Sequence, residues 1–339
     1  MTRTLTTLIC SLILAVSATA HAKTFKIATV APDGTAWMKE MKKGAQEIAT
    51  RTEGRVKFRF YPGGVMGSDR AILRKMRIGQ LHGGAITGGG LAETYPDANI
   101  YSLPLAFQSL AEVDYVRQHM DQQLIDNLRE EGFVSFGFSE GGFAYLMSHQ
   151  PIAGITDLSG KKVWTPDGDK ISQAAFEAVG VSPVPLLLTD VLTGLQTGTV
   201  DTVAISAVGA IALQWHTKVK YVTDIPLMYL YGTLIMNRKD FDKLSAGDQV
   251  IVREVMSNVF ERLDEITRED NNKAYAALEN QGIQFVAPST TDQQQWQSSV
   301  VTAVDQLVQR GVVSKPVTEA FYKHLSDYRN GQQQASHAP

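Results

Sequence analysis

Hydrophobic and polar residues follow two different periods in the first part of the chain. Over residues 23–30 apolar and polar positions alternate one by one, which is the period of a half-buried strand. Over residues 37–48 the apolar positions recur every three or four residues, which predicts an amphipathic helix. Residues 56–62 repeat the strand pattern, and residues 67–80 repeat the helix pattern, with a Ser-Asp pair near the start to cap it. This alternation indicates an α/β fold with a largely parallel sheet.

The same alternation returns after residue 158. Two further strand–helix pairs are predicted there, at residues 161–166, 169–180, 181–186 and 189–198. Residues 246–280 then hold a helical period of apolar residues without a proline. A helix of that length is on the order of 50 Å long at about 1.5 Å per residue, which exceeds the width of a single small domain. We therefore expect this helix to lie across two domains.

Length and composition support a two-domain globular protein. The chain has 339 residues, of which 44% are hydrophobic. A chain of this length usually divides into two domains, and this composition is enough to build substantial cores. The formal net charge is only −3, and no stripe of Lys and Arg with interleaved aromatic residues is present. Nucleic acid is therefore not expected as a partner.

Residues 1–22 have the pattern of a secretory signal peptide. Arg3 precedes an apolar run, and small residues lead to an A-x-A site that ends at Ala22. The run is too short to span a membrane, and no later run of 18 or more apolar residues occurs. The apolar run continues past Cys10, the only cysteine, which disfavours a lipid-anchored alternative. Cleavage after Ala22 would remove this cysteine, so we expect a soluble periplasmic chain without disulfides.

One short motif raises the possibility of an enzyme. Residues 137–141 match the G-x-S-x-G nucleophile elbow, with Ser139 as the nucleophile. That motif needs a strand, a sharp turn and a helix, whereas residues 142–147 form an apolar run that predicts a strand, so a secreted serine hydrolase is the less favoured alternative. The histidines show no paired metal-ligand spacing, and Asp167 and Asp169 fit an ordinary turn better than a cation site. We expect no cofactor and no metal site.

Five segments of the chain carry a family resemblance when they are taken in order and at their spacing. They include the blocks DLSGKKV and TGTVD. Together they resemble the periplasmic solute-binding subunits of tripartite ATP-independent periplasmic (TRAP) transporters, the DctP-like family. The segments are residues 60–84, 103–107, 151–163, 178–201 and 220–249.

The resemblance implies a two-lobed periplasmic binding protein of the α/β class, in which each lobe is a sheet flanked by helices. Hinge strands and a long shared helix would join the lobes, which close on a small-molecule ligand held in the cleft. A monomeric, non-enzymatic protein would then dock on the membrane subunits of a TRAP permease that is driven by an ion gradient. The implied division is residues 23–139 with 230–272 for one lobe, residues 140–229 with 273–329 for the other, and a disordered tail at residues 330–339.

The resemblance also places two aromatic residues in the ligand site. Family members typically hold a substrate carboxylate with an arginine in the strand after the DLSGKKV block, where this chain has Trp164. A second arginine is often found at the position of Phe143. Both positions face the cleft in relatives, so the two rings are expected to wall a pocket for an apolar or planar ligand, unless both are core residues. A ligand carboxylate would need another partner, such as backbone amides near Thr87 and Gly88 or the helix start at Asp190.

Three further residues complete the candidate ligand site. Trp37 follows the first strand and turn, where such proteins bring a side chain to the cleft, although it also begins an apolar helical face. Ser206 ends a segment that replaces the polar G-Q-E-N of relatives, and Trp215 forms an exposed-looking pair with His216. The chain is thus expected to capture a small organic solute, either an organic acid or a more apolar compound. A carrier of a hydrophobic or lipid-like ligand is the alternative within this class.

Overall fold

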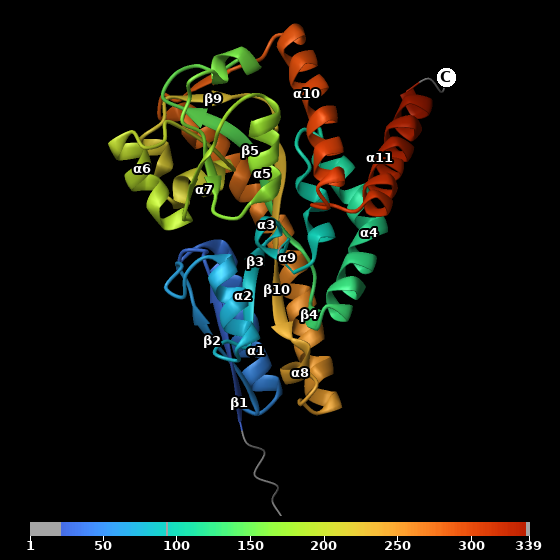
Figure 1. Cartoon of the computed structure of the whole chain (residues 1–339). Coiled ribbons are helices and arrows are strands. Elements are labelled where there is room, and N and C mark those ends of the chain that lie inside the picture. Colours follow the sequence, from blue (N-terminus) through green and yellow to red (C-terminus); the bar gives the residue numbers. More distant parts are fainter. Residues whose placement is uncertain (1–21, 93, 337–339) are drawn as a thin grey trace, which may run out of the picture.

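The computed structural model describes residues 22–92 and 94–336. The signal peptide predicted over residues 1–22 lies outside these residues except for Ala22. Figure 1 shows an α/β molecule of two lobes, in which helices flank the strands. The predicted fold class is confirmed.

The first strands and helices form where the hydrophobic pattern predicts them. β1 pairs in parallel with both β2 and β3, so this part of the sheet is built from strand–helix units. Ser68 caps the second helix, because its side chain accepts a hydrogen bond from the backbone N–H of Ala71. The elements are β1 (Lys23–Thr29), α1 (Ala36–Arg51), β2 (Val56–Tyr61), α2 (Asp69–Arg77), β3 (Gly83–Thr87) and α3 (Gly88–Leu91).

The middle of the chain supplies a long helix and the second lobe. These elements are α4 (Leu110–Glu130), β4 (Phe133–Ser135), β5 (Ser139–Ser148), β6 (Trp164–Pro166), α5 (Lys170–Ala178), β7 (Val184–Leu186), α6 (Val191–Thr197), β8 (Thr202–Ile205), α7 (Ala207–Ala212) and β9 (Tyr221–Thr223). The last part adds β10 (Met228–Asn237), α8 (Arg238–Phe241), α9 (Ala246–Asn280), β11 (Gln284–Val286), α10 (Thr290–Gln309) and α11 (Lys315–Ser336). Short 3-10 turns link them at Pro96–Ser102, Ile155–Leu158, Leu188–Asp190 and Trp215–Thr217.

Two long antiparallel strands, β5 and β10, form the centre of the main sheet of the described chain. The strand order is β11-β9-β5-β10-β3-β1-β2, with β4 beside β10 and β8 beside β5. β10 pairs with β3 in one lobe, whereas β5 pairs with β8 and β9 in the other. These two strands therefore join the lobes. The predicted lobe boundaries, at residues 139/140 and 229/230, fall within β5 and β10 and stay a prediction.

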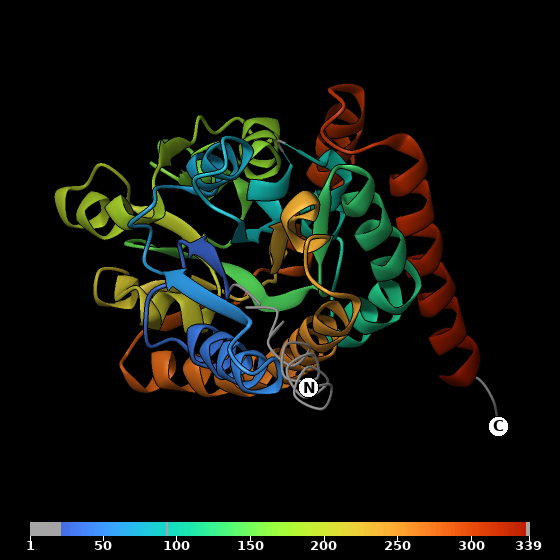
Figure 2. The same ribbon diagram turned by 90° about the horizontal axis from the view of Figure 1, so that it is seen from below.

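Helix α9 covers both lobes, as its length predicts. Its N-terminal half contributes Val252 and Val259 to the hydrophobic cluster that contains Phe25 of β1. Its C-terminal half contributes Ala274 and Leu278 to a different cluster in the second lobe. The view from below in Figure 2 shows α1 lying against this helix, and the two are in contact. One continuous helix thus has a separate core at each end.

The end of the chain differs from the expected disordered tail. Helix α11 continues to Ser336, so the prediction of disorder for residues 330–339 is wrong over residues 330–336. The side chain of Arg329 anchors this helix, because it donates hydrogen bonds to the Glu112 carboxylate at 2.7 and 3.1 Å. Asn330 and Gly331, which follow Arg329, are poor helix formers, and the helix continues through them into the glutamines at residues 332–334, which are good ones.

Candidate functional site

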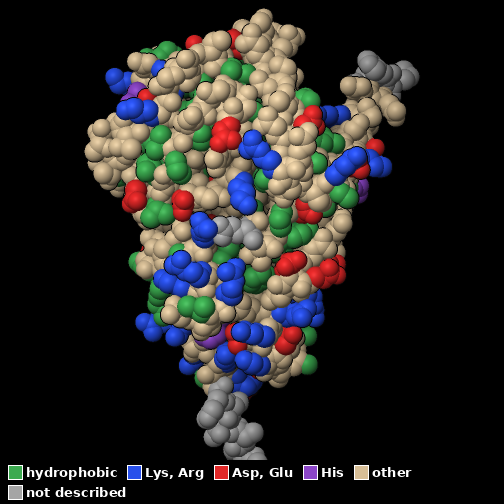
Figure 3. All heavy atoms as spheres, in the orientation of Figure 1, with side chains coloured by type: hydrophobic (Ala, Val, Ile, Leu, Met, Phe, Trp, Pro, Cys, Tyr) green, Lys and Arg blue, Asp and Glu red, His purple; other side chains and the backbone are tan. Residues whose placement is uncertain are grey.

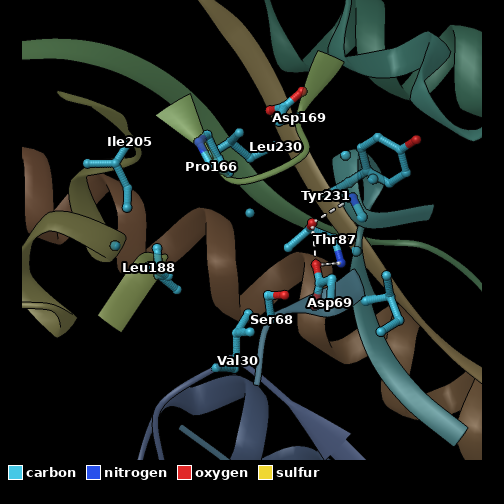
Figure 4. A pocket seen from close by; sticks show the side chains of 18 of the residues that line it. Val30, Ser68, Asp69, Thr87, Pro166, Asp169, Leu188, Ile205, Leu230 and Tyr231 are labelled. Atoms are coloured by element: carbon cyan, nitrogen blue, oxygen red, sulfur yellow. Dashed lines mark hydrogen bonds between the residues drawn. The ribbon is translucent and has the colours of Figure 1, made fainter. Parts of the chain in front are cut away.

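A cavity of about 420 Å³ lies where the two lobes meet. In one lobe its wall comes from the end of β1, the start of α2 and the turn between β3 and α3. In the other lobe it comes from β6, the loop before α5 and the turn between β8 and α7, while β5 and β10 pass between. Figure 4 shows the apolar side chains of Leu188 and Ile205 on one side of the cavity and the carboxylate of Asp69 on the other, with Leu230 and Asp169 at the top of the view.

Trp164 belongs to both the cavity wall and the core. The residue lines the cavity, yet only 4% of its surface is exposed. Its indole N–H donates a hydrogen bond to the backbone carbonyl of Leu186 at 3.1 Å, which joins β6 to β7. Its ring meets that of Trp215 edge to face, with centroids 4.9 Å apart. The ring is therefore held rigidly, with its polar N–H already used by the protein.

Asp69 and Thr87 form the polar edge of the cavity in the first lobe. One oxygen of Asp69, Oδ2, accepts hydrogen bonds from the backbone N–H of Thr87 at 3.0 Å and from its hydroxyl at 2.6 Å. The same hydroxyl oxygen accepts a bond from the N–H of Gly90 and so caps α3. Burial raises the pKa of the Asp69 carboxyl to about 6, although the two bonds from Thr87 favour its charged form.

Asp169 is the corresponding carboxylate of the second lobe. It caps α5 by accepting bonds from the N–H groups of Ile171 and Ser172, both at 3.1 Å, and from the Ser172 hydroxyl at 2.6 Å. Burial raises the pKa of this carboxyl as well, against the effect of those hydrogen bonds. A Cβ on Gly89 would lie 3.2 Å from the Asp169 carboxyl carbon. The glycine turn of one lobe therefore meets the carboxylate of the other.

Glycine is needed in that turn because the carboxylates lie so close. A Cβ on Gly90 would lie 2.4 Å from the Asp69 oxygen, a contact that real side chains do not make. A Cβ on Gly88 would lie 2.6 Å from the ring of Tyr231 on β10. The three consecutive glycines thus let β10 and both carboxylates approach the same short helix.

Ser139 and Glu140 reach the cavity from β5. Glu140 is 3% exposed, and its Oε2 accepts a hydrogen bond from the Arg268 side chain of α9 at 2.8 Å. Burial raises the pKa of Glu140, while the bond from Arg268 opposes the shift. Arg268 also bonds Asp114 of α4, so one guanidinium links two helices and the strand. Ser139 is 1% exposed and lies inside the strand.

The structure brings together five of the eight residues that the sequence singled out. The residues that line the cavity are Trp37, Thr87, Gly88, Trp164 and Ser206. Whether they contact a ligand stays a prediction.

The other three predicted residues lie outside the cavity lining. Phe143 packs against Tyr229, with ring centroids 5.9 Å apart. Asp190 is exposed at the end of the 3-10 turn before α6. Trp215 was expected to be exposed, which is wrong: it is 1% exposed, because it packs behind Trp164 in the core of the second lobe.

The two cavity carboxylates were not predicted as ligand-site residues. Asp69 had only the signal of a helix cap, and Asp169 only that of a turn. Their shared position at one cavity depends on how residues that are 100 positions apart come together in the fold. No local pattern in the sequence indicates that these two residues lie at the same cavity.

A family comparison decides the class of the protein. Residues 27–310 match the family model of the bacterial extracellular solute-binding proteins, family 7. The chain belongs to this family. The predicted resemblance is confirmed, and this solute-binding protein serves transport and is not an enzyme. Ser139 lies within a strand and not at a strand–helix turn, which agrees with that conclusion.

Individual relatives are distant in sequence and close in fold. A solute-binding protein of Roseobacter denitrificans is 26% identical over 275 residues, which cover 80% of this chain and 83% of that protein. The sugar acid binding protein of Advenella mimigardefordensis, in complex with galactonate, has a TM-score of 0.83 at 18% identity, covering 91% of this chain and 99% of that one. A TRAP periplasmic solute-binding protein of Desulfovibrio salexigens with bound orotic acid has a TM-score of 0.82 at 19% identity, and the match covers 90% of this chain and 99% of that one.

The described residues hold neither a membrane-spanning helix nor a cluster of metal ligands. Within residues 22–92 and 94–336, no helix combines the length and the apolar character that crossing a membrane requires. In the same residues, no three His, Cys, Asp or Glu side chains gather as metal ligands would.

Proposed function

We propose that this solute-binding protein captures a small organic solute in the cavity between its lobes and delivers it to the membrane subunits of a TRAP permease. The observation that carries the proposal is the cavity of about 420 Å³, walled by both lobes of a family-7 fold. Pockets for small molecules span roughly 300–1,000 Å³, so a solute of modest size would fill this one. Closure of the lobes would sequester the solute, and opening at the permease would release it.

We further propose that the protein works in the periplasm as a monomer after cleavage behind Ala22. The small-residue site before Lys23 supports this cleavage. A strand that begins at Lys23 also supports it, because β1 then starts directly behind the site. The lobes would be divided as the sequence predicts, within β5 and β10.

The wall of the cavity supports a solute with an apolar or planar body. Trp164, Leu188 and Ile205 present apolar side chains to it. Burial of apolar surface contributes about 25 cal/mol per Å², so a solute body that covers these side chains together would add a few kcal/mol to binding. Galactonate and orotic acid in the two solved relatives are acids, and an acid remains one candidate for this chain. A more hydrophobic, lipid-like solute is the other, favoured by the apolar wall.

The test is the identity of the bound solute. The chain from Lys23 onwards would be purified without a refolding step, and molecules released by denaturation would be identified by mass spectrometry. The same solute should be taken up by proteoliposomes that hold the cognate permease under an ion gradient, and only when the protein is added. A protein that yields no solute and binds none would contradict the proposal. Uptake that is equally fast without it would contradict delivery.

A further inference from the structure

Four polar atoms of the cavity-lining residues are buried without a hydrogen-bond partner in the described part of the chain. Asp69 Oδ1, Ser139 Oγ, Glu140 Oε1 and the Tyr231 hydroxyl make up this set. Only three other buried side-chain atoms of the described residues lack a partner. Buried polar groups are normally hydrogen-bonded, so a concentration of unpaired atoms around one cavity points to groups that a ligand satisfies.

Two of these atoms belong to carboxylates, which act only as acceptors when they are charged. Ser139 and Tyr231 can donate or accept. While both are charged, neither carboxylate oxygen can bond to a ligand carboxylate, which also lacks a donor. Each of them can bond to a ligand N–H or O–H. The two carboxylates thus match a ligand that donates hydrogen bonds, and the two hydroxyls fit either kind of partner.

Most charged residues of the lining are acidic, and one of them, Glu140, is already paired with Arg268 of α9. Among the described residues, the acidic members of the lining are Asp69, Glu140, Asp167 and Asp169. The lining contains one arginine, Arg70, whose residue is exposed to solvent, and no lysine. The outer face of the same lobe differs, because Figure 3 shows many Lys and Arg side chains over the region of α1 and α2. The acidic lining is therefore a local property of the cavity.

The protein's own carboxylate also occupies the backbone donor that an anionic ligand could use. A ligand carboxylate placed at this turn would find the N–H of Thr87 bonded to Asp69 and the N–H of Gly90 bonded to the Thr87 hydroxyl, and it would lie beside the Asp69 carboxylate. The turn near Thr87 was one of the candidates from the sequence for holding a ligand carboxylate, and the bond from the Thr87 N–H to Asp69 argues against that role for Thr87.

We propose that the solute is an organic cation, an amine or amidine with an apolar or planar body, whose nitrogen donates to Asp69. This inference rests on the proposed function and specifies its substrate class. The body of the cation then lies toward Trp164 and the apolar wall, where its burial contributes affinity without a further charge.

The test compares probes that share one body and differ in one group. Phenethylamine, 2-phenylethanol and phenylacetate have similar size and carry a cationic, a neutral and an anionic group. Calorimetry on the wild-type chain should give the highest affinity for the amine, a lower one for the alcohol and the lowest for the acid. The affinities for the amine and the acid should differ about 100-fold or more, because charge pairs in desolvated sites produce differences of this order. Tighter binding of phenylacetate than of phenethylamine would overturn the inference and leave the proposed function standing.

Variants show whether Asp69 sets the ranking. Asp69→Asn keeps the size of the side chain and should lower the affinity for phenethylamine about 10-fold or more. Asp305→Asn removes the same charge from an exposed position on α10, outside the cavity lining, and should leave the affinity unchanged. Equal affinities in wild type and Asp69→Asn would contradict the assignment of Asp69. The ranking in the wild type needs no variant, so the test holds even if Asp69→Asn does not fold.

A wider panel separates failure of the inference from failure of the proposed function. A library of cationic, neutral and anionic organic solutes would be screened by the rise in melting temperature of the purified protein. Cations should dominate the binders. Binders that are mainly carboxylates would overturn the inference alone. A library in which no solute of any charge binds, together with the absence of a co-purified solute, would contradict the proposed function itself.

Discussion

The carboxylate of Asp69 accepts hydrogen bonds from both the backbone N–H and the hydroxyl of Thr87, at 3.0 and 2.6 Å. The pair fixes the start of α2 against the turn between β3 and α3, and it forms the polar edge of the cavity. Oδ2 thus accepts two hydrogen bonds, whereas Oδ1 is buried without a hydrogen-bond partner. Burial raises the pKa of Asp69 to about 6, compared with 3.8 for an ordinary aspartate.

The first prediction concerns the pH dependence of stability in the variant Asp69→Asn. Because the pKa of Asp69 is higher in the folded state, the folded chain binds more protons between about pH 4 and 6. Its free energy of unfolding therefore falls as the pH rises through this window. One pKa unit corresponds to about 1.4 kcal/mol, so the ionisation of Asp69 lowers the free energy of unfolding by at most about 3 kcal/mol by pH 7. The asparagine cannot titrate, and its amide oxygen can still accept from Thr87.

Urea unfolding of the solute-free proteins at pH 4.5, 6 and 7.5 measures the effect. The stability of Asp69→Asn relative to the wild type should rise with pH and level off above about pH 7. Asp169 and Glu140 titrate in both proteins, so their contributions cancel in the difference. Parallel pH profiles for the two proteins would show that burial does not shift the titration of Asp69.

The second prediction concerns Gly142→Ala in β5. Gly142 has φ = 83°, and an added Cβ would lie 2.4 Å from the amide nitrogen of Asn271 on α9. The Asn271 side chain would have to move, although it accepts from the N–H of Val208 and donates to the carbonyl oxygens of Gly141 and Thr267. The left-handed backbone and the lost hydrogen bonds together should lower the free energy of unfolding by about 2–3 kcal/mol.

Gly160→Ala is the matched control for this variant. Gly160 has φ = 73°, but an added Cβ would meet nothing within 4 Å. Only the backbone penalty of about 1 kcal/mol should remain. If urea unfolding gives both variants the same loss, the contact with Asn271 contributes nothing to stability.

The features that could be predicted from sequence are those that a local period determines. The first strands and helices and the full extent of α9 follow from apolar positions that recur along one face, whatever the rest of the fold does. The burial of Trp215 could not be predicted in this way, because it depends on Trp164, which lies some 50 residues away in sequence. The meeting of Asp69 with Thr87 likewise joins two separate elements, and only the tertiary structure shows it.

The third prediction concerns closure of the lobes. β5, β10 and α9 connect the lobes, and the pairing of β5 with β10 shifts register between Leu230 and Tyr231, at the cavity. Such an irregularity is a place where two strands can bend. Small-angle scattering should therefore give a smaller radius of gyration at saturation with the co-purified solute than after its removal. The control is a solute that calorimetry shows not to bind, and an unchanged radius with the bound solute would contradict closure.

The fourth prediction distinguishes the two roles of Trp164, as part of the core and as part of the cavity wall. Its indole N–H bonds the carbonyl of Leu186, and its ring packs against Trp215, so Trp164→Phe should reduce stability. The loss should be about 1–3 kcal/mol, because the smaller ring leaves a space and the buried carbonyl loses its donor. If the exposed face of the indole contacts the solute, the affinity should also fall, about 5- to 20-fold.

Trp215→Phe provides the matched comparison, because it makes the same change on the other side of the same ring pair. Trp215 is 1% exposed and does not line the cavity, so its variant should lose stability while the folded protein keeps the wild-type affinity. Calorimetry with the co-purified solute, at a temperature where both variants remain folded, gives the affinities. A specific loss in Trp164→Phe would identify this ring as the wall against which the solute packs. Equal affinities in the two variants would mean that Trp164 stabilises the second lobe and contributes nothing to recognition.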